Sequence, residues 1–249
     1  MLNIVIPMAG RGSRFATAGF TLPKPLIQVR GVPMIELVVN NLRPSQAHRF
    51  TFLCLEEHLS EFNVASTLRR MAPGCNIVPV RETTEGAACT VLLAKSHINT
   101  TDPLMIANSD QWVDVPIDKY LASGQGTDQD GLIMTMRADD PKWSYIRFND
   151  AGGISEVVEK QVVSPEATVG IYNFAHGSDF VNAAEEMIAQ DLRVNNEFYV
   201  APCYNQLIDA GKDIGYFNIG SEGDGMYGLG IPSDLELFLN SKVAMRAVA

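Results

Sequence analysis

The sequence predicts an α/β fold with a mostly parallel central sheet flanked by helices, and three observations support this prediction. Short apolar runs alternate with helix-like patterns over roughly the first 130 residues. Glycine or polar motifs follow several of the apolar runs directly. Beyond this region, turn-rich pieces separate shorter strand-like runs, which predicts a smaller antiparallel section.

The first part of the chain predicts βαβ units. In chain order the expected elements are strand 3–7, helix 34–42, strand 50–55, helix 59–71, strand 77–80, helix 87–98 and strand 104–107. The carboxyl ends of parallel strands meet at one edge of a sheet, where ligands bind. We therefore expect the loop around Gly10 and Gly12, the pair Glu85-Gly86 and the run 108–110 to converge there.

The second part predicts a different arrangement. Its expected elements are strands 131–136, 145–148, 154–159 and 168–174, helix 178–190, strand 214–218 and helix 233–247. Turns such as 149–153 separate the strands, which favours antiparallel pairing. We expect one domain over residues 1–249, with about 1–130 binding one ligand and about 131–249 closing over the cleft and completing the fold.

Composition and charge limit the classes of function. A net charge of −10 argues against a broad basic surface for nucleic acid but allows a few cations to gather in one cleft. No apolar window of 18 residues and no charged leader occur, so we expect a cytoplasmic protein without a membrane span. The four cysteines are widely spaced, which favours buried free thiols over metal ligands.

The most informative segment is the glycine loop Met8-Ala9-Gly10-Arg11-Gly12-Ser13-Arg14-Phe15, followed by Pro23-Lys24-Pro25. Two glycines let the backbone approach an anion, and consecutive N–H groups can point at phosphate oxygens. Arg14 and Lys24 add full positive charges, so the layout suits a triphosphate. A Walker loop would need Gly-Lys-Ser/Thr, and a dinucleotide loop would need a small residue at Phe15. A tight turn with solvated arginines is the plain structural alternative.

These residues resemble the signature of the sugar-phosphate nucleotidylyltransferases of the nucleotidyltransferase superfamily, Gly-x-Gly-Ser/Thr-Arg and then Pro-Lys-Pro. The resemblance extends over nearly the whole chain, because further motifs occur in the family's order: 84–88, 108–110, 158–160, 169–172 and 230–235. It implies a Rossmann-like fold of the GT-A type without the β-helical domain that some relatives carry.

The resemblance implies a reaction in which a phosphorylated acceptor attacks the α-phosphorus of an NTP and releases pyrophosphate. A phosphomonoester is largely dianionic at neutral pH, so charge neutralisation and positioning matter more than a base. Arg14 and Lys24 are the expected catalytic cations, and Asp110 is the expected ligand of Mg²⁺. Plain alternatives remain, since a strand-end aspartate often makes only a local turn.

The resemblance also assigns binding roles. Residues 9–13, that is Ala9, Gly10, Arg11, Gly12 and Ser13, would bind the nucleotide, as would Glu85, Gly86 and Asn108. Relatives often have Gln at the position of Glu85, which leaves the base open. Glu159, Lys160, Gly170 and Glu197 would bind the acceptor. Solvated strand ends or helix caps would explain Glu159, Lys160 and Glu197 equally simply.

One position departs from the family pattern. Many relatives have a second acidic metal ligand where this chain has Gly228. Asp224 or Glu222 could replace it, or Asp110 could hold Mg²⁺ with phosphate oxygens and water. Trp112 and Trp143 are expected in the core rather than in the cleft.

The expected activity is NMP transfer to a sugar 1-phosphate, with an NTP and the phosphorylated acceptor as partners, no nucleic acid, and a homo-oligomer left open. A cytidylyl or uridylyl transfer to a phosphocholine-like acceptor is the main alternative, and an aromatic box around a quaternary amine would favour it. A glycosyltransferase using a nucleotide sugar ranks third, since it has no role for Arg14 with Lys24. A nucleotide-sensing module would not need Asp110.

Overall fold

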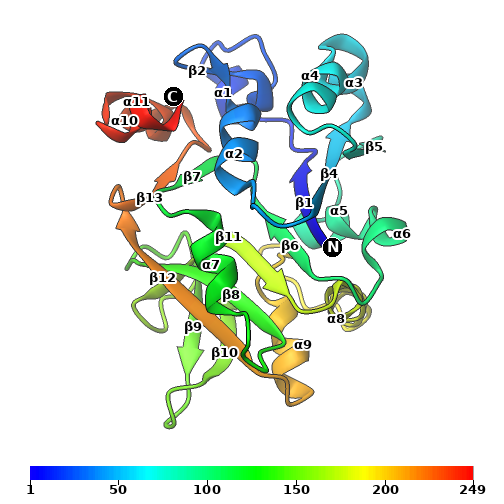
Figure 1. Cartoon of the computed structure of the whole chain (residues 1–249), viewed down its shortest axis with the longest axis vertical. Helices are drawn as coiled ribbons and strands as arrows, with labels where there is room; N and C mark the ends of the chain where they lie inside the picture. Colours follow the sequence, from blue (N-terminus) through cyan, green and yellow to red (C-terminus); the bar gives the residue numbers. More distant parts are fainter. Residues whose placement is uncertain (249) are drawn as a thin grey trace.

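The computed structural model describes residues 1–248 and is built around one large twisted sheet (Figure 1). Eleven strands form this sheet, with the order β5-β4-β1-β6-β11-β8-β12-β13-β7 and with β9 and β10 attached beside β11. A separate two-stranded sheet pairs β2 (Gln28–Val29) with β3 (Val32–Pro33). The sheet and its helices confirm the predicted α/β class.

The first part of the sheet is parallel. β1 (Leu2–Met8) lies between β4 (His48–Leu55) and β6 (Leu104–Ala107), and β5 (Asn76–Val80) pairs with β4. Side chains of β1 alternate between two cores, because successive residues of a strand point to opposite faces. Ile4 and Ile6 pack against α2 (Met34–Leu42) on one face, whereas Val5 packs toward α5 (Ala87–Leu92) on the other.

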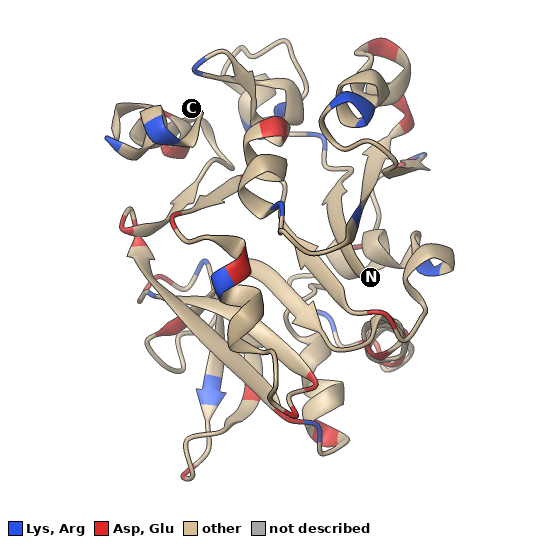
Figure 2. Cartoon of the chain, in the orientation of Figure 1, with Lys and Arg blue, Asp and Glu red and all other residues tan. Residues whose placement is uncertain are grey.

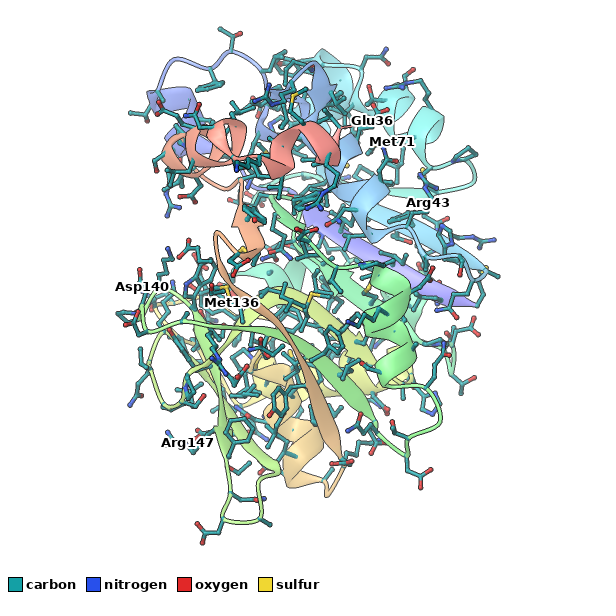
Figure 3. All side chains as sticks on the ribbon, turned by 60° about the vertical axis from the view of Figure 1, so that its left-hand side comes forward. Glu36, Arg43, Met71, Met136, Asp140 and Arg147 are labelled. Carbon is teal, nitrogen blue, oxygen red and sulfur yellow. The ribbon has the colours of Figure 1, made fainter. Side chains whose placement is uncertain are left out.

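Three helices predicted as single units are interrupted. The segment 59–71 forms α3 (Glu56–Glu61) and α4 (Val64–Met71), because Asn63 adopts a left-handed φ of 51° between them. The segment 87–98 divides into α5 and α6 (Lys95–Ile98), and 233–247 divides into α10 (Pro232–Asn240) and α11 (Val243–Ala247). At the other end of α4, Arg43, which follows α2, donates to the Met71 carbonyl at 2.6 Å and so ties the two helices together (Figure 3).

The second part continues the same sheet rather than forming a separate one. β11 (Glu166–Phe174) pairs antiparallel with β6 and with β8 (Gly131–Arg137), so it joins the two parts. β9 (Ser144–Phe148) and β10 (Ile154–Glu159) form an antiparallel hairpin beside β11. β12 (Ile214–Glu222) runs parallel to β8, which makes the whole sheet mixed.

The remaining elements complete the layers around the sheet. α8 (Gly177–Ala189) and α9 (Cys203–Asp209) pack on the face of α5, and the C-terminal helices pack on the segment after β1 with Trp112 in their core. Elements that the sequence analysis did not predict are β2, β3, α9, α1 (Ser13–Thr17), the 3-10 turn η1 (Lys24–Leu26), β7 (Gln111–Val113), α7 (Ile117–Ser123) and β13 (Gly225–Gly228).

Charged residues are distributed over both parts of the molecule, with basic positions interspersed among acidic ones (Figure 2). Cys54 and Cys203 are buried, whereas Cys75 and Cys89 are partly exposed, and all four are free. Across residues 1–248, no helix has the length and apolar character that a membrane crossing requires.

Candidate active site

Three adjoining cavities lie at the carboxyl edge of the parallel strands. The glycine-loop cavity, of about 320 Å³, is bounded by the loop after β1, residues 83–90 and the run after β6. The charged cavity, of about 570 Å³, lies between the glycine loop and Asp234. The aromatic cavity, of about 240 Å³, contains Trp143, Tyr172 and Tyr199. Asn108 lines all three, so they form one continuous cleft.

The expected convergence of motifs at this edge is present. Gly10, Gly86 and Asp110 line the glycine-loop cavity, although they follow three different strands. Asp110 stands in the short link between β6 and β7, and its carbonyl accepts a hydrogen bond from the Leu229 amide at 2.8 Å. This contact fixes the backbone from which the Asp110 carboxylate projects.

Gly86 allows a close backbone contact beside the glycine-loop cavity. Its φ is +132°, and a Cβ at this position would lie 2.4 Å from the Phe198 carbonyl oxygen. The Phe198 amide donates to the Glu85 carbonyl at 2.8 Å, and the Ala88 amide donates to the Phe198 carbonyl at 3.0 Å. The resulting wall consists of backbone and of the small residues Gly86 and Ala87, which leave room for a planar ring.

The hydroxyls of two threonines lie beside this wall. Thr84 Oγ1 lies 2.6 Å from Thr90 Oγ1 and donates to the Gly86 carbonyl at 2.8 Å. Both threonines line the glycine-loop cavity. They add polar edges to a surface that is otherwise made of backbone and small side chains.

The charged cavity gathers cations from distant parts of the chain. Gly12, Ser13, Arg14 and Lys24 form one wall, and Lys142 and Lys160 also line this cavity. A Cβ at Gly12 would lie 3.1 Å from the Lys24 Cβ, which shows how closely the glycine loop approaches the Pro23-Lys24-Pro25 segment. Arg14 and Lys24 therefore reach the same cavity, as the triphosphate interpretation requires.

Two carboxylates face these cations. The Lys24 ammonium donates to Asp110 Oδ2 at 2.7 Å, and Asp234, at the start of α10, lines the same cavity. Burial, together with the negative charges of Glu222 and Asp110, raises the pKa of the Asp234 carboxyl, while Lys142 and Arg14 oppose the shift. The pKa shift shows that Asp234 shares its surroundings with Asp110 and with both cations.

Asp234 takes the place of the side chain that is missing at position 228. A Cβ built on Gly228 would lie 3.2 Å from Asp234 Oδ2, and a Cβ on Gly230 would lie 2.9 Å from Asp110 Oδ2. The two other acids raised from the sequence, Glu222 and Asp224, do not line the charged cavity. Glu222 is hydrogen-bonded to Lys142 at 3.0 Å, and Asp224 is absent from the lining of the charged cavity.

The oxygen donors of Asp110 and Asp234 fit the preference of Mg²⁺, which binds through one or two carboxylates and keeps waters or phosphate oxygens as its other ligands. Within residues 1–248 no cluster of three His, Cys, Asp or Glu side chains forms a closed metal cage.

The aromatic cavity combines a buried carboxylate with hydroxyls. Glu159 accepts a short hydrogen bond from Ser144, and Thr168 Oγ1 lies 2.9 Å from the Tyr172 hydroxyl. Burial raises the pKa of Glu159, and the Ser144 hydrogen bond and Lys160 partly counteract this shift. Gly170 lets the backbone pass close to the Asn108 side chain. A Cβ on its left-handed backbone (φ +79°) would lie only 2.1 Å from Asn108 Nδ2.

Two aromatic rings in this cavity are already paired with lysines of the protein. Lys142 Nζ lies 4.8 Å from the centre of the Trp143 ring. Lys160 Nζ lies 4.8 Å from the centre of the Tyr199 ring and donates to its hydroxyl at 2.7 Å. The rings therefore hold ammonium groups of the chain itself, which favours an anionic group on the ligand.

Some expected site residues lie elsewhere. The Arg11 side chain is exposed, 3.9 Å from Glu57, and does not line the cleft. Glu85 accepts a hydrogen bond from Arg193 at 3.2 Å, and its side chain is absent from the cavity lining. Glu197, expected to bind the acceptor, lines the glycine-loop cavity and not the aromatic cavity that the other three expected acceptor residues line.

Sequence reasoning missed four residues of the cleft. Asp234 lies within a motif that was noted, but its neighbours gave no reason to select it. Lys142 and Gln111 carried no recognised pattern, and Trp143 was expected in the core but lines two cavities. A signal for Gln111 existed, because it directly follows Asp110.

Comparisons with known proteins agree with this architecture. Residues 4–214 match the family described as nucleotidyl transferase. Over 179 residues the chain is 25% identical to the mannose-1-phosphate guanylyltransferase catalytic subunit beta of Danio rerio, covering 70% of this chain and 50% of that protein. A nucleoside-diphosphate-sugar pyrophosphorylase structure from Vibrio cholerae superposes with a TM-score of 0.79 at 26% identity, covering 96% of this chain and 100% of that chain.

A shorter match concerns a different acceptor. Over 49 residues the chain is 47% identical to the 2-aminoethylphosphonate cytidylyltransferase of Lancefieldella rimae, covering 20% of each protein. The chain spans about half the length, or less, of the curated relatives that it matches.

Proposed function

The chain belongs to the nucleotidyl transferase family, and we propose that it transfers the NMP unit of an NTP to a sugar 1-phosphate, releasing pyrophosphate and forming an NDP-sugar. The observation that carries this proposal is the convergence of Arg14, Lys24 and Lys160 with Asp110 around one cavity. Two polyanionic reactants repel each other, and this arrangement places cations where the repulsion must be cancelled.

The proposed reaction requires one displacement. A non-bridging oxygen of the acceptor's phosphate forms a bond to the α-phosphorus, and the bond from that phosphorus to the bridging oxygen of the β-phosphate breaks. The electron pair leaves with pyrophosphate. Because the acceptor phosphate is largely dianionic at neutral pH, no side chain has to remove a proton.

Each cavity has a role in this proposal. The wall at Gly86 and Ala87 binds the base of the nucleotide, and the glycine loop binds the triphosphate through its backbone N–H groups. Arg14 and Lys24 neutralise the pyrophosphate that leaves, and Lys160 neutralises the incoming phosphate. Glu159 and its neighbouring hydroxyls take the acceptor's hydroxyl groups.

Mg²⁺ belongs to the proposal as the expected cofactor. Asp110 and Asp234 would hold it, because both carboxylates line the charged cavity and Asp234 occupies the space left free at Gly228. When bound, the ion would add positive charge to the phosphates and help to orient them. The protein itself places the two carboxylates beside Arg14 and Lys24, the cations proposed to bind the triphosphate.

The proposal treats the chain as one domain with two parts. The continuous sheet supports this view, since β11 pairs with β6 of the first part and β8 of the second. Residues up to about 130 would bind the nucleotide, and the later part would supply Glu159, Lys160 and Gly170 for the acceptor.

The aromatic cavity favours a sugar over a phosphocholine-like acceptor. A box for a quaternary amine needs free ring faces, but Trp143 and Tyr199 are paired with Lys142 and Lys160. Two ammonium groups in a small cavity would also repel a cationic acceptor. The short match to a 2-aminoethylphosphonate cytidylyltransferase keeps such acceptors in the test.

A pyrophosphate-release assay tests the proposal. The purified chain would be supplied with each of the four common NTPs, Mg²⁺ and a panel of sugar 1-phosphates, with phosphocholine and 2-aminoethylphosphonate as alternative acceptors. We expect release with one NTP and a sugar 1-phosphate, an NDP-sugar by mass spectrometry, and loss of activity with EDTA. Release only with the amine-bearing acceptors would refute the sugar assignment, and no release with any pair would refute the transfer itself.

A further inference from the structure

Four residues line both the charged cavity and the aromatic cavity: Asn108, Lys142, Trp143 and Lys160. In the proposed reaction the sugar of the acceptor lies in the aromatic cavity, and the α-phosphorus that it attacks lies in the charged cavity. The phosphate of the acceptor must therefore lie where the two cavities meet. Two of the four shared residues are lysines. The sequence analysis assigned a phosphate to Lys160 and gave no role to Lys142.

The loop between β8 and β9 presents Lys142 to this junction. The Lys142 amide donates to Asp140 Oδ1 at 2.9 Å, and the Lys160 amide donates to the Trp143 carbonyl at 3.0 Å. The second contact ties the two lysine-bearing segments together. Figure 3 labels Asp140 in this loop, close to Met136 at the end of β8.

The Lys142 side chain is held from two sides. Its Nζ donates to both carboxylate oxygens of Glu222, at 3.0 and 3.1 Å, and lies 4.8 Å from the Trp143 ring centre. Asp140 Oδ2 is a second, longer ion-pair partner at 3.6 Å. An ammonium has three N–H donors, and the hydrogen bonds of Lys142 Nζ go to Glu222 alone, so one donor is left for another anion. A restrained lysine loses less conformational entropy when a ligand binds, which strengthens binding.

Two side chains of the charged cavity, Trp143 at the junction and Gln111 outside the aromatic cavity, carry polar groups without a partner among residues 1–248. Gln111 is 6% exposed, and its Nε2 makes no hydrogen bond within the described chain. Trp143 Nε1 is likewise buried without an acceptor among residues 1–248. Both side chains line the charged cavity. Unpaired buried donors are costly, and both of these side chains border the cavity in which the oxyanion of the proposed reaction would lie.

We propose that Lys142 is a second cation for the acceptor's phosphate, acting with Lys160 to place the attacking oxygen, while Gln111 lines the same phosphate site. This inference rests on the proposed function, because it identifies the bound phosphate as that of the acceptor. It divides the four lysine and arginine side chains of the charged cavity into two pairs: Arg14 with Lys24 for the pyrophosphate, and Lys142 with Lys160 for the incoming phosphate.

Binding of two simple anions tests this division. Inorganic phosphate and pyrophosphate would each be titrated calorimetrically into the wild type and into K142Q, K142R, R14Q and K95Q. Lys95 is a matched control, because it is also ion-paired, with Glu185 at 2.6 Å, but lies outside the cleft. Melting temperatures of all variants would check their folding.

We expect K142Q to weaken phosphate binding about 10- to 100-fold, the usual effect of losing a charged hydrogen bond. K142R should retain most of the affinity, K95Q should bind like the wild type, and R14Q should weaken pyrophosphate more than phosphate. In the transfer assay, K142Q should raise KM for the acceptor more than KM for the NTP. Equal phosphate affinity in folded K142Q and wild type would overturn the inference, as would no phosphate binding by the wild type or an equal loss in K95Q.

Failure of this inference is distinguishable from failure of the proposed function. If the wild type transfers NMP but K142Q matches it in phosphate affinity and acceptor KM, the role of Lys142 is wrong and the transfer stands. If no NTP and acceptor pair reacts while phosphate binding still depends on Lys142, the transfer is refuted and the assignment of that phosphate to an acceptor fails with it.

Discussion

The ammonium of Lys24 donates a hydrogen bond to Asp110 Oδ2 across 2.7 Å, although 86 residues separate the two in the chain. Neither side chain is fully exposed, with 19% of Lys24 and 27% of Asp110 accessible. Each group thus satisfies the other within the chain. In the proposed reaction both would exchange this partner, Lys24 for a phosphate oxygen and Asp110 for Mg²⁺, so the pair keeps two charges in place for the substrate.

The first prediction concerns Asp110. The D110N variant loses the carboxylate proposed to hold Mg²⁺, and its kcat should fall about 100-fold or more. Mn²⁺ binding, followed by electron paramagnetic resonance in the presence of NTP, should weaken in parallel. D102N is a suitable control, because Asp102 is ion-paired with the N-terminus at 3.0 Å, outside the cleft. Wild-type Mn²⁺ affinity in D110N would contradict the assignment.

The second prediction concerns Asp234. If it replaces the acid missing at Gly228, D234N should weaken Mn²⁺ binding, and D110N with D234N combined should cost less than the sum of the single effects, since both act on one ion. E222Q serves as the control, because Glu222 is bonded to Lys142 rather than lining the charged cavity. Strictly additive losses, or a larger effect of E222Q on Mn²⁺, would favour the alternative raised from the sequence.

The third prediction separates the two arginines of the glycine loop. R14Q should raise KM for NTP or lower kcat by about 10- to 100-fold, because Arg14 lines the charged cavity. R11Q should change either value by less than about twofold, since Arg11 is exposed beside Glu57. Steady-state kinetics on both variants gives the comparison. Equal losses would show that Arg11 turns into the cleft when the nucleotide binds.

The fourth prediction concerns Gly170. The G170A variant places a Cβ within 2.1 Å of Asn108 Nδ2 on a left-handed backbone, so it should lose about 2 kcal/mol or more of unfolding free energy together with acceptor binding. G152A is the matched control, because Gly152 has φ +84° with no atom within 4 Å of the added Cβ. It should lose only about 1 kcal/mol. Urea denaturation measures both, and equal losses would mean that the close approach to Asn108 has no role.

The fifth prediction is a pH dependence due to Glu159. Burial raises the pKa of this carboxyl in the folded protein, so the folded state keeps its proton to higher pH than the unfolded chain. As the pH rises through the interval between the two pKa values, the unfolded chain loses its proton first and stability falls. E159Q cannot titrate and should show a smaller decrease between about pH 4 and pH 7 in urea denaturation. Parallel pH profiles for both proteins would disprove this origin.

The sequence alone predicted the features that depend on local pattern. Strand 104–107 and helix 34–42 were predicted with the bounds that the structure has, because each is a buried apolar run or a clear helical repeat. The convergence of the glycine loop, Gly86 and Asp110 was also predicted, since parallel strands fix where their following loops lie. The interruptions of three helices were not predicted, since an apolar repeat can continue across a residue such as Asn63 whose backbone leaves the helical conformation.

The tertiary structure decided which neighbouring side chains reach the cleft. Arg11 and Arg14 are three residues apart in one motif, yet only Arg14 lines the charged cavity, because the first helical turn at Ser13–Thr17 directs the two side chains differently. Packing of α10 against β13 places Asp234 beside Gly228 in the charged cavity, whereas Glu222 and Asp224 do not line that cavity. The positions of these residues in the sequence do not indicate this arrangement. Composition and motif order thus determined the family and the edge of the sheet at which the cleft forms. Which charged side chains face the cleft was decided by tertiary packing, because contacts between distant segments orient each side chain.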